Sequence, residues 1–100
     1  MPKSIINFGS LNLDHVYGVL DFVQPGETLA SHDYKQFVGG KGLNQSIALA
    51  RAGADVFHVG CIGKEGALLK KTLEENNVNV ANVIEIDAPS GHAIIQVNAR

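Results

Sequence analysis

The sequence of 100 residues has little of several residue types, and each shortage excludes something. Its only cysteine, Cys61, can form no disulfide within the chain, and in an apolar run it is expected to be a small buried residue. A net charge of −2 gives neither a basic footprint for nucleic acid nor a polybasic membrane anchor. The apolar run at residues 4–9 is too short for a signal peptide or a membrane span, so a cytoplasmic location is expected. The four histidines have no metal-ligand spacing, so structural or solvated roles are expected for them.

Apolar residues make up 45% of the chain, which is enough for one modest core, and their spacing predicts an α/β fold. Strands are predicted for residues 4–9, 16–23, 29–38, 56–62, 83–86 and 93–97, and helices for residues 43–52 and 65–76. The order strand, loop, helix, strand, helix, strand in the middle of the chain argues for a parallel sheet. Residues 16–38 and 91–98 interrupt this order and are expected to form a small separate sheet. Core positions are predicted at Ile5, Ile6, Phe8, Phe57 and Val59.

The glycine-rich segment Gly39-Gly40-Lys41-Gly42 precedes the first predicted helix. Adjacent glycines let a backbone approach a ligand closely or adopt positive φ, and Lys41 adds a mobile cation. Asn44 falls in the first helical turn, where backbone N–H groups and the positive end of the helix dipole favour polar ligands. A glycine loop before an ordinary helix explains the same residues equally well. The spacing fits neither a P-loop nor a dinucleotide-binding loop.

A second polar pair, Asn12 and Asp14, follows the first predicted strand. In an open parallel sheet, ligands bind beyond the carboxyl ends of the strands. Side chains two residues apart on an extended backbone point the same way, and a carboxylate with an amide suits adjacent sugar hydroxyls. These residue types also favour turns, so the pair taken on its own is better explained by a simple turn.

Several motifs, in order, resemble those of the PfkB, or ribokinase-like, carbohydrate kinases. The first signature of this family is similar to the run Gly39-Gly40-Lys41-Gly42-Leu43-Asn44-Gln45-Ser46, followed by Gly53 and Gly63. The opening of ribokinases is similar to the run Gly9-Ser10-Leu11-Asn12-Leu13-Asp14-His15, and the turn before their lid to Pro25-Gly26-Glu27-Thr28. The resemblance covers nearly the whole chain and is more specific for the superfamily than for ribokinases within it.

The resemblance implies the N-terminal portion of a three-layer α/β kinase fold with a small β-sheet lid. All 100 residues would then belong to one domain, with lid strands at about 16–38 and 91–98. The family binds the sugar through an Asn and an Asp after the first strand, through residues of the signature, and through an apolar residue of the lid. The corresponding substrate-binding residues here are Asn12, Asp14, Gly39, Gly40, Lys41, Asn44 and Ile95. The family's lid also often forms the contact between subunits, so a homodimer is expected.

The implied activity is transfer of the γ-phosphoryl group of ATP, accompanied by Mg²⁺, to a hydroxyl of a small sugar. Ribose is favoured, while fructose, nucleosides and other furanose-like substrates stay open. A non-catalytic sugar-binding or dimerisation module of the same fold is the alternative from another functional class. A dinucleotide-binding domain is disfavoured because its glycine pattern is absent.

The sequence departs from the family's pattern in two places. The segment Lys64-Glu65-Gly66 is about two residues shorter than the family's loop, which puts the local loop in doubt. The family's Gly-Ala-Gly-Asp segment, which supplies the general base, the anion hole and much of the ATP site, is absent from the 100 residues. We therefore expect no catalytic residue in this segment and no kinase activity from residues 1–100 alone. ATP and Mg²⁺ are expected to bind mainly through residues beyond Arg100.

Overall fold

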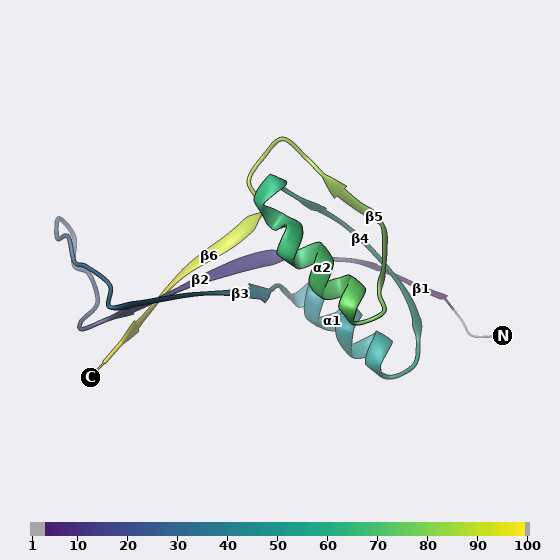
Figure 1. The fold of residues 1–100 in the computed structure, drawn as a ribbon, viewed down its shortest axis with the longest axis horizontal. Coiled ribbons are helices and arrows are strands. Elements are labelled where there is room, and N and C mark those ends of the chain that lie inside the picture. Colours follow the sequence, from purple (N-terminus) through teal and green to yellow (C-terminus); the bar gives the residue numbers. More distant parts are fainter. Residues whose placement is uncertain (1–3, 100) are drawn as a thin grey trace.

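The computed structural model describes residues 4–99, which form two sheets of three strands each and two α-helices (Figure 1). In chain order the elements are β1 (Ser4–Phe8), β2 (Asn12–Val19), β3 (Asp33–Gly39), α1 (Lys41–Arg51), β4 (Asp55–Ile62), the short 3₁₀ helix η1 (Lys64–Gly66), α2 (Ala67–Glu75), β5 (Asn79–Glu85) and β6 (Gly91–Asn98). The second sheet extends away from the helices, so the molecule is elongated, with extents of 57 × 31 × 19 Å. The predicted α/β fold with a small additional sheet is confirmed.

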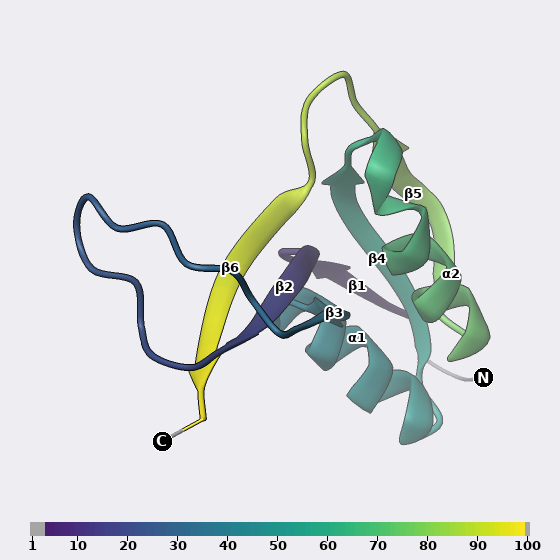
Figure 2. The same ribbon diagram turned by 60° about the vertical axis from the view of Figure 1, so that its left-hand side comes forward.

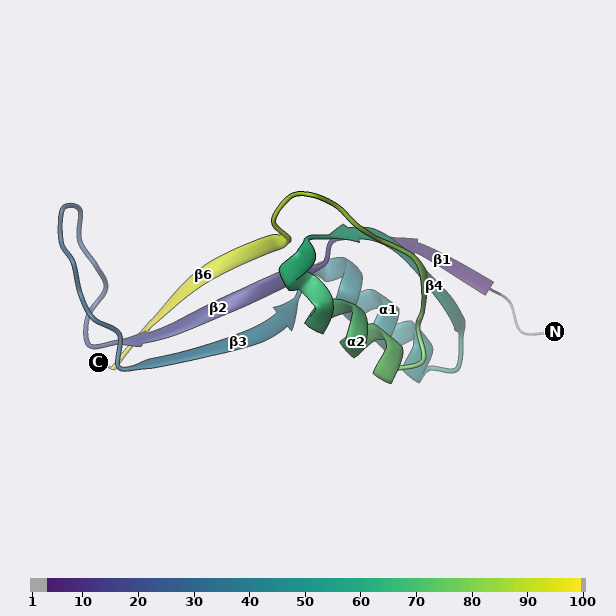
Figure 3. The same cartoon turned by 45° about the horizontal axis from the view of Figure 1, so that its top comes forward.

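The first sheet has the strand order β1–β4–β5, and both of its strand pairs are parallel. Each crossover between its strands carries a helix, as parallel strands require. Helices α1 and α2 lie on the same side of this sheet, and Figures 2 and 3 show them from two directions. Their apolar stripes pack on that face and form the main core, which contains Leu43, Val56, Ile62, Leu69, Leu73, Val78 and Val83. The predicted parallel core is therefore confirmed.

The opposite face of the first sheet is bare, and the predicted burial of several residues is wrong for this reason. Ile6 is 69% exposed and Phe8 is 80% exposed, while Ile5 is half-buried. Cys61, expected to be buried, is exposed as well. Phe57 and Val59 are only half-buried; the fully buried positions of β4 alternate with them and are Val56, His58 and Ile62. Successive strand residues point to opposite faces, and the helices cover only one of them.

The second sheet has the order β3–β2–β6, with β2 antiparallel to β3 and parallel to β6 (Figure 3). Segments 29–38 and 91–98 were predicted to lie outside the parallel core, and their strands β3 and β6 do so. The predicted boundaries differ, because β2 already begins at Asn12 and β3 begins only at Asp33. The residues between them contain no strand, and Gly26, with a φ of 77°, lies in a turn there.

Candidate functional site

Asn12 and Asp14 lie within β2, at the end of the second sheet nearest the helices. The strand continues through both residues, so the alternative explanation of the pair as a turn does not apply. Because they are two residues apart in a strand, both side chains point to the same face of the sheet. Both are half-buried, which leaves polar atoms accessible to a ligand.

Glycines of the neighbouring strands make room for these two polar side chains. Asn12 is paired with Gly39 on β3 and with Gly91 on β6. A Cβ atom at Gly39 would lie 2.6 Å from Oδ2 of Asp14, and a Cβ atom at Gly91 would collide with Oδ1 of Asn12. A larger residue at either position would displace the polar side chain, so the glycines leave the space that the carboxylate and the amide occupy.

Gly40 joins β3 to α1 and requires a backbone conformation that favours glycine. Its φ is 103°, and a Cβ atom there would lie 2.6 Å from the carbonyl oxygen of Ser10. The same carbonyl accepts a hydrogen bond of 3.1 Å from the backbone N–H of Leu43 in the first turn of α1. The start of α1 has no side-chain cap and no acidic residue, so the positive end of its dipole is not neutralised by this helix. The chain therefore places a positively polarised helix start beside Asn12.

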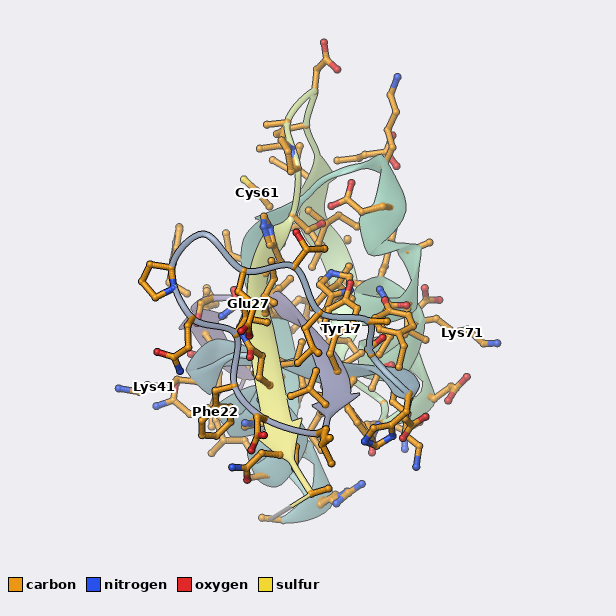
Figure 4. The ribbon with its side chains drawn as sticks, turned by 90° about the vertical axis from the view of Figure 1, so that its left-hand side faces the viewer. Tyr17, Phe22, Glu27, Lys41, Cys61 and Lys71 are labelled. Atoms are coloured by element: carbon orange, nitrogen blue, oxygen red, sulfur yellow. The ribbon has the colours of Figure 1, made fainter. Side chains whose placement is uncertain are left out.

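Lys41 and Asn44, the other predicted polar contacts, both lie in the first turn of α1. They are exposed and, being three residues apart, share a side of the helix. Lys41 points outward from the ribbon (Figure 4). The structure thus places Gly39 against Asn12 and Asp14, and Gly40 beside the backbone of Asn12, with Lys41 and Asn44 in the first turn of the helix that follows.

Ile95, the predicted apolar contact, lies on β6. Its register partner is Val16, and the partner of Asp14 on the same strand is Ala93. Paired residues of adjacent strands share a face, so Ile95 lies on the face of the second sheet that carries Asp14. A shallow hollow of about 420 Å³ continues on this face, lined by residues that include Val16, Lys35, Phe37 and Val97. A larger hollow of about 590 Å³ lies among residues 20–29 and Asn98, away from the predicted contacts.

A buried polar network beneath this region was missed by the sequence analysis. It begins at Asn7 of β1, whose Nδ2 donates to the carbonyl of Gly42 and to Oγ of Ser46, both at 2.9 Å. Ser46 Oγ lies 2.6 Å from Nδ1 of His58, whose Nε2 lies 3.0 Å from the carbonyl oxygen of Gly9. Ser46 and His58 both have no exposed surface. Burial lowers the pKa of His58 below its ordinary value of 6.5, although its hydrogen bond with Gly9 opposes this shift.

The sequence contained one sign of this network. Ser46 occupies an apolar position of the first predicted helix, between Leu43 and Ala50 on the same stripe, and a polar residue there requires a buried partner. No pattern in the sequence identifies His58 as that partner, since it is 12 residues away on β4.

A second polar cluster holds the loop that leads into β6. The carboxylate of Glu65 accepts a hydrogen bond from the backbone N–H of Ser90, and Oγ of Ser90 accepts one of 2.8 Å from the N–H of Gly63. The hydrogen bond from the Ser90 backbone N–H, followed by one from the Ser90 side chain, lowers the pKa of the Glu65 carboxyl below its ordinary value. The segment expected to be shorter than the family's loop, Lys64–Gly66, forms a 3₁₀ turn, and these hydrogen bonds fasten it to the residue before β6.

Among residues 4–99, no group of three or more His, Cys, Asp or Glu side chains lies close enough together to hold a metal ion. None of the helices in these residues is long and apolar enough to cross a membrane.

Comparison with known proteins gives consistent results. Residues 2–100 match the model of the pfkB family carbohydrate kinases. Ribokinase from Haemophilus influenzae is 38% identical over 100 residues, an alignment that covers 97% of this chain and 33% of that protein. The crystal structure of ribokinase from Cryptococcus neoformans in complex with ADP superposes with a TM-score of 0.92 at 36% identity, covering 99% of this chain and 31% of that one.

The structure of Arabidopsis thaliana ribokinase with ribose and ATP superposes with a TM-score of 0.89 at 26% identity, covering 99% of this chain and 33% of that one. The chain thus spans about a third or less of the length of the curated relatives it matches first.

Proposed function

This chain belongs to the pfkB family of carbohydrate kinases, and from this premise we propose that it forms the sugar-binding part of an ATP-dependent sugar kinase. Ribose is the favoured sugar, because the similar proteins from Haemophilus influenzae and Cryptococcus neoformans are ribokinases and the Arabidopsis thaliana protein was solved with ribose. The observation that carries the proposal is the placement of Asn12 and Asp14 side by side on one face of β2, each lying over a glycine of a neighbouring strand.

The chemistry of these groups suits a polyhydroxylated ring. The Asp14 carboxylate accepts hydrogen bonds from two hydroxyls, and the Asn12 amide both donates and accepts. Lys41 and Asn44 approach the sugar from the start of α1, and the glycine pair lets the sugar approach the backbone there. The apolar side chain of Ile95 covers the non-polar side of the ring from β6.

Phosphoryl transfer depends on positioning the acceptor hydroxyl and on stabilising charge, and this segment serves the first of these needs. Asn12 and Asp14 fix the ring hydroxyls so that the acceptor oxygen points toward the γ-phosphoryl group of ATP. The second sheet acts as a lid that excludes water when the sugar is bound. The sequence contains no Gly-Ala-Gly-Asp segment, so the base, the anion hole and most ATP contacts are assigned to residues outside this chain. Mg²⁺ would accompany ATP there.

Two further predictions belong to this proposal. The second sheet has a face directed away from Asp14, which carries Tyr17, Tyr34 and Ile94. Tyr34 is 48% exposed and Ile94 is 68% exposed, which favours contact with a second copy and hence a homodimer through the lid. A cytoplasmic location is the other prediction.

The test is an assay of ADP formation by the natural protein that contains this chain, with ribose, fructose and adenosine supplied separately. Ribose-dependent ADP formation is expected, together with ribose binding in isothermal titration calorimetry. ADP formation with fructose or adenosine but not with ribose would support the kinase activity and show that the substrate is not ribose. Binding without turnover would support the non-catalytic sugar-binding module, and neither binding nor turnover with any of the three would refute the proposal.

A further inference from the structure

The buried network from Asn7 to His58 allows only one arrangement of protons while the imidazole is neutral. Backbone carbonyls, which can only accept, stand at both of its ends: Gly42 at one and Gly9 at the other. The Asn7 amide must therefore donate at the first end, and His58 must carry its proton on Nε2 at the second. Nδ1 of His58 is then an acceptor, and the hydroxyl of Ser46 donates to it while accepting from Asn7. Within residues 4–99, no buried side-chain nitrogen or oxygen is left without a partner.

Both ends of this network lie at the proposed sugar site. Gly9 belongs to the short loop between β1 and β2, three residues before Asn12, and Gly42 belongs to the first turn of α1, directly after Lys41. The two glycines are themselves in contact, because a Cβ atom at Gly9 would lie 2.5 Å from the Cα of Gly42. His58 and Asn7 therefore hold, from below, the two backbone segments that carry the sugar-binding side chains.

We propose that Asn7, Ser46 and His58 position the sugar site, and that this function requires a neutral His58, so that sugar binding weakens at acid pH. The proposal rests on the sugar-binding function proposed above. The three side chains do not touch the sugar; they are positioning residues that act through the loop at Gly9 and the start of α1.

Protonation of His58 disrupts the network at a defined atom. A proton on Nδ1 turns this nitrogen into a donor aimed at Oγ of Ser46, which already accepts from Asn7. The Ser46 hydroxyl then loses its acceptor and must rotate, in a site that has no exposed surface. The two groups that hydrogen-bond the imidazole are uncharged: the Ser46 hydroxyl from α1 and the Gly9 carbonyl from the β1–β2 loop. Neither of these groups carries a charge that would compensate a histidinium, and burial opposes it.

The kinetic test uses variants of the natural protein that contains this chain. His58→Gln keeps an amide donor near the position of Nε2 and cannot be protonated, whereas His58→Leu removes every polar atom of the ring. We expect His58→Leu, which removes both hydrogen bonds of the imidazole, to raise KM for ribose by at least about threefold, the effect of losing a single neutral hydrogen bond, with KM for ATP unchanged. Ser46→Ala should raise it similarly. Val83→Ala, which lowers stability within the core but lies outside the network, is the matched control and should leave KM unchanged.

The pH dependence separates positioning from general destabilisation. In the wild type, KM for ribose should rise as the pH falls below the ordinary histidine pKa of 6.5, because the pKa of His58 is lowered by burial. His58→Gln should remove this rise while keeping KM at neutral pH within about twofold of the wild type. If His58→Leu does not fold, His58→Gln and Ser46→Ala still decide the matter. The proposal would be overturned if KM for ribose still rose at acid pH in His58→Gln, or if KM for ribose were unchanged in Ser46→Ala.

Nuclear magnetic resonance of ¹⁵N-labelled histidine tests the network independently of any sugar. His58 should show the neutral Nε2–H form at neutral pH, and Ser46→Ala should shift its Nδ1 resonance. A protein with this spectrum but no affinity for any sugar would refute the sugar-binding function and, with it, the positioning function. A protein that binds ribose while His58 is charged at neutral pH would refute only the positioning proposal.

Discussion

Replacement of Asp14 by alanine is the most direct test of the proposed site. Asp14 lies half-buried on β2 over Gly39, with its carboxylate toward the face that also carries Ile95. If the carboxylate accepts hydroxyl hydrogen bonds, each such charged hydrogen bond contributes about 1.5–3 kcal/mol. Loss of even one lowers kcat/KM for ribose by between about tenfold and a hundredfold. KM for ATP should stay within about twofold of the wild type, because the change removes a contact to the sugar alone.

The assay is steady-state ADP formation by the natural protein that contains this chain, with ribose and ATP varied in turn. Asp33→Ala is the matched control, because Asp33 is an exposed carboxylate on the same face at the far end of the second sheet. Thermal unfolding of both variants should stay close to that of the wild type, since neither side chain is part of the main core. An unchanged kcat/KM for ribose in Asp14→Ala would remove the residue from the site, and an equal loss in Asp33→Ala would attribute the effect to the sheet as a whole.

Three further predictions concern other parts of the chain. Gly39→Ala should raise KM for ribose severalfold without preventing formation of the lid. The new Cβ would lie 2.6 Å from Oδ2 of Asp14 and would displace the carboxylate. Steady-state kinetics at fixed ATP measures this change in KM. Glu65→Gln should remove part of the loss of folding stability at acid pH. The pKa of Glu65 is lower in the folded than in the unfolded state, so the carboxylate stabilises the fold fully at a pH above its unfolded-state pKa. This stabilisation is lost as the pH falls through the folded-state pKa. Thermal unfolding between about pH 6 and pH 3 measures this, and equal slopes in the two proteins would contradict it. Residues 1–100 alone should show no sugar-dependent ADP formation, because the segment that supplies the base is absent from the sequence.

The order and type of the core elements could be predicted because each depends on local spacing. Leu43 and Ile47 repeat at the helical period. Gly53 follows the C-cap residue of α1 and has a φ of 95°, the left-handed conformation that a glycine after a helix commonly adopts. The start of β2 could not be predicted in this way. Asn12 and Asp14 have turn-forming side chains, and their extended conformation depends on pairing with β3 and β6, which are distant in sequence.

The core positions predicted for β4, Phe57 and Val59, were wrong for a related reason. Apolar residues occupy both of its faces, so the alternation of Val56, Phe57, His58 and Val59 does not show which face the helices cover. The apolar residues Phe57 and Val59 were predicted to lie in the core, whereas the helices pack on the opposite face of the strand, which carries Val56 and His58. A histidine with no exposed surface is acceptable there only because Ser46 and Gly9 satisfy both of its nitrogens, and such three-dimensional pairing leaves no periodic signal in the sequence.

The bare face of the first sheet leads to the last prediction, which concerns self-association. Near-continuous apolar strands are typical of parallel sheets that are covered on both faces, yet Ile6, Phe8 and Ile84 are between 58% and 80% exposed. Burying one such side chain fully stabilises by about 1.5–3 kcal/mol, so covering this face, by a second copy or by another polypeptide segment, is strongly favourable. The purified 100-residue chain should therefore form oligomers or aggregates and show a broad thermal transition. The double variant Ile6→Thr/Phe8→Thr should shift it toward the monomer in sedimentation velocity without changing its circular dichroism, because β1 keeps its pairing with β4. A wild-type chain that stays monomeric at high concentration and unfolds sharply would show that the exposed face needs no cover.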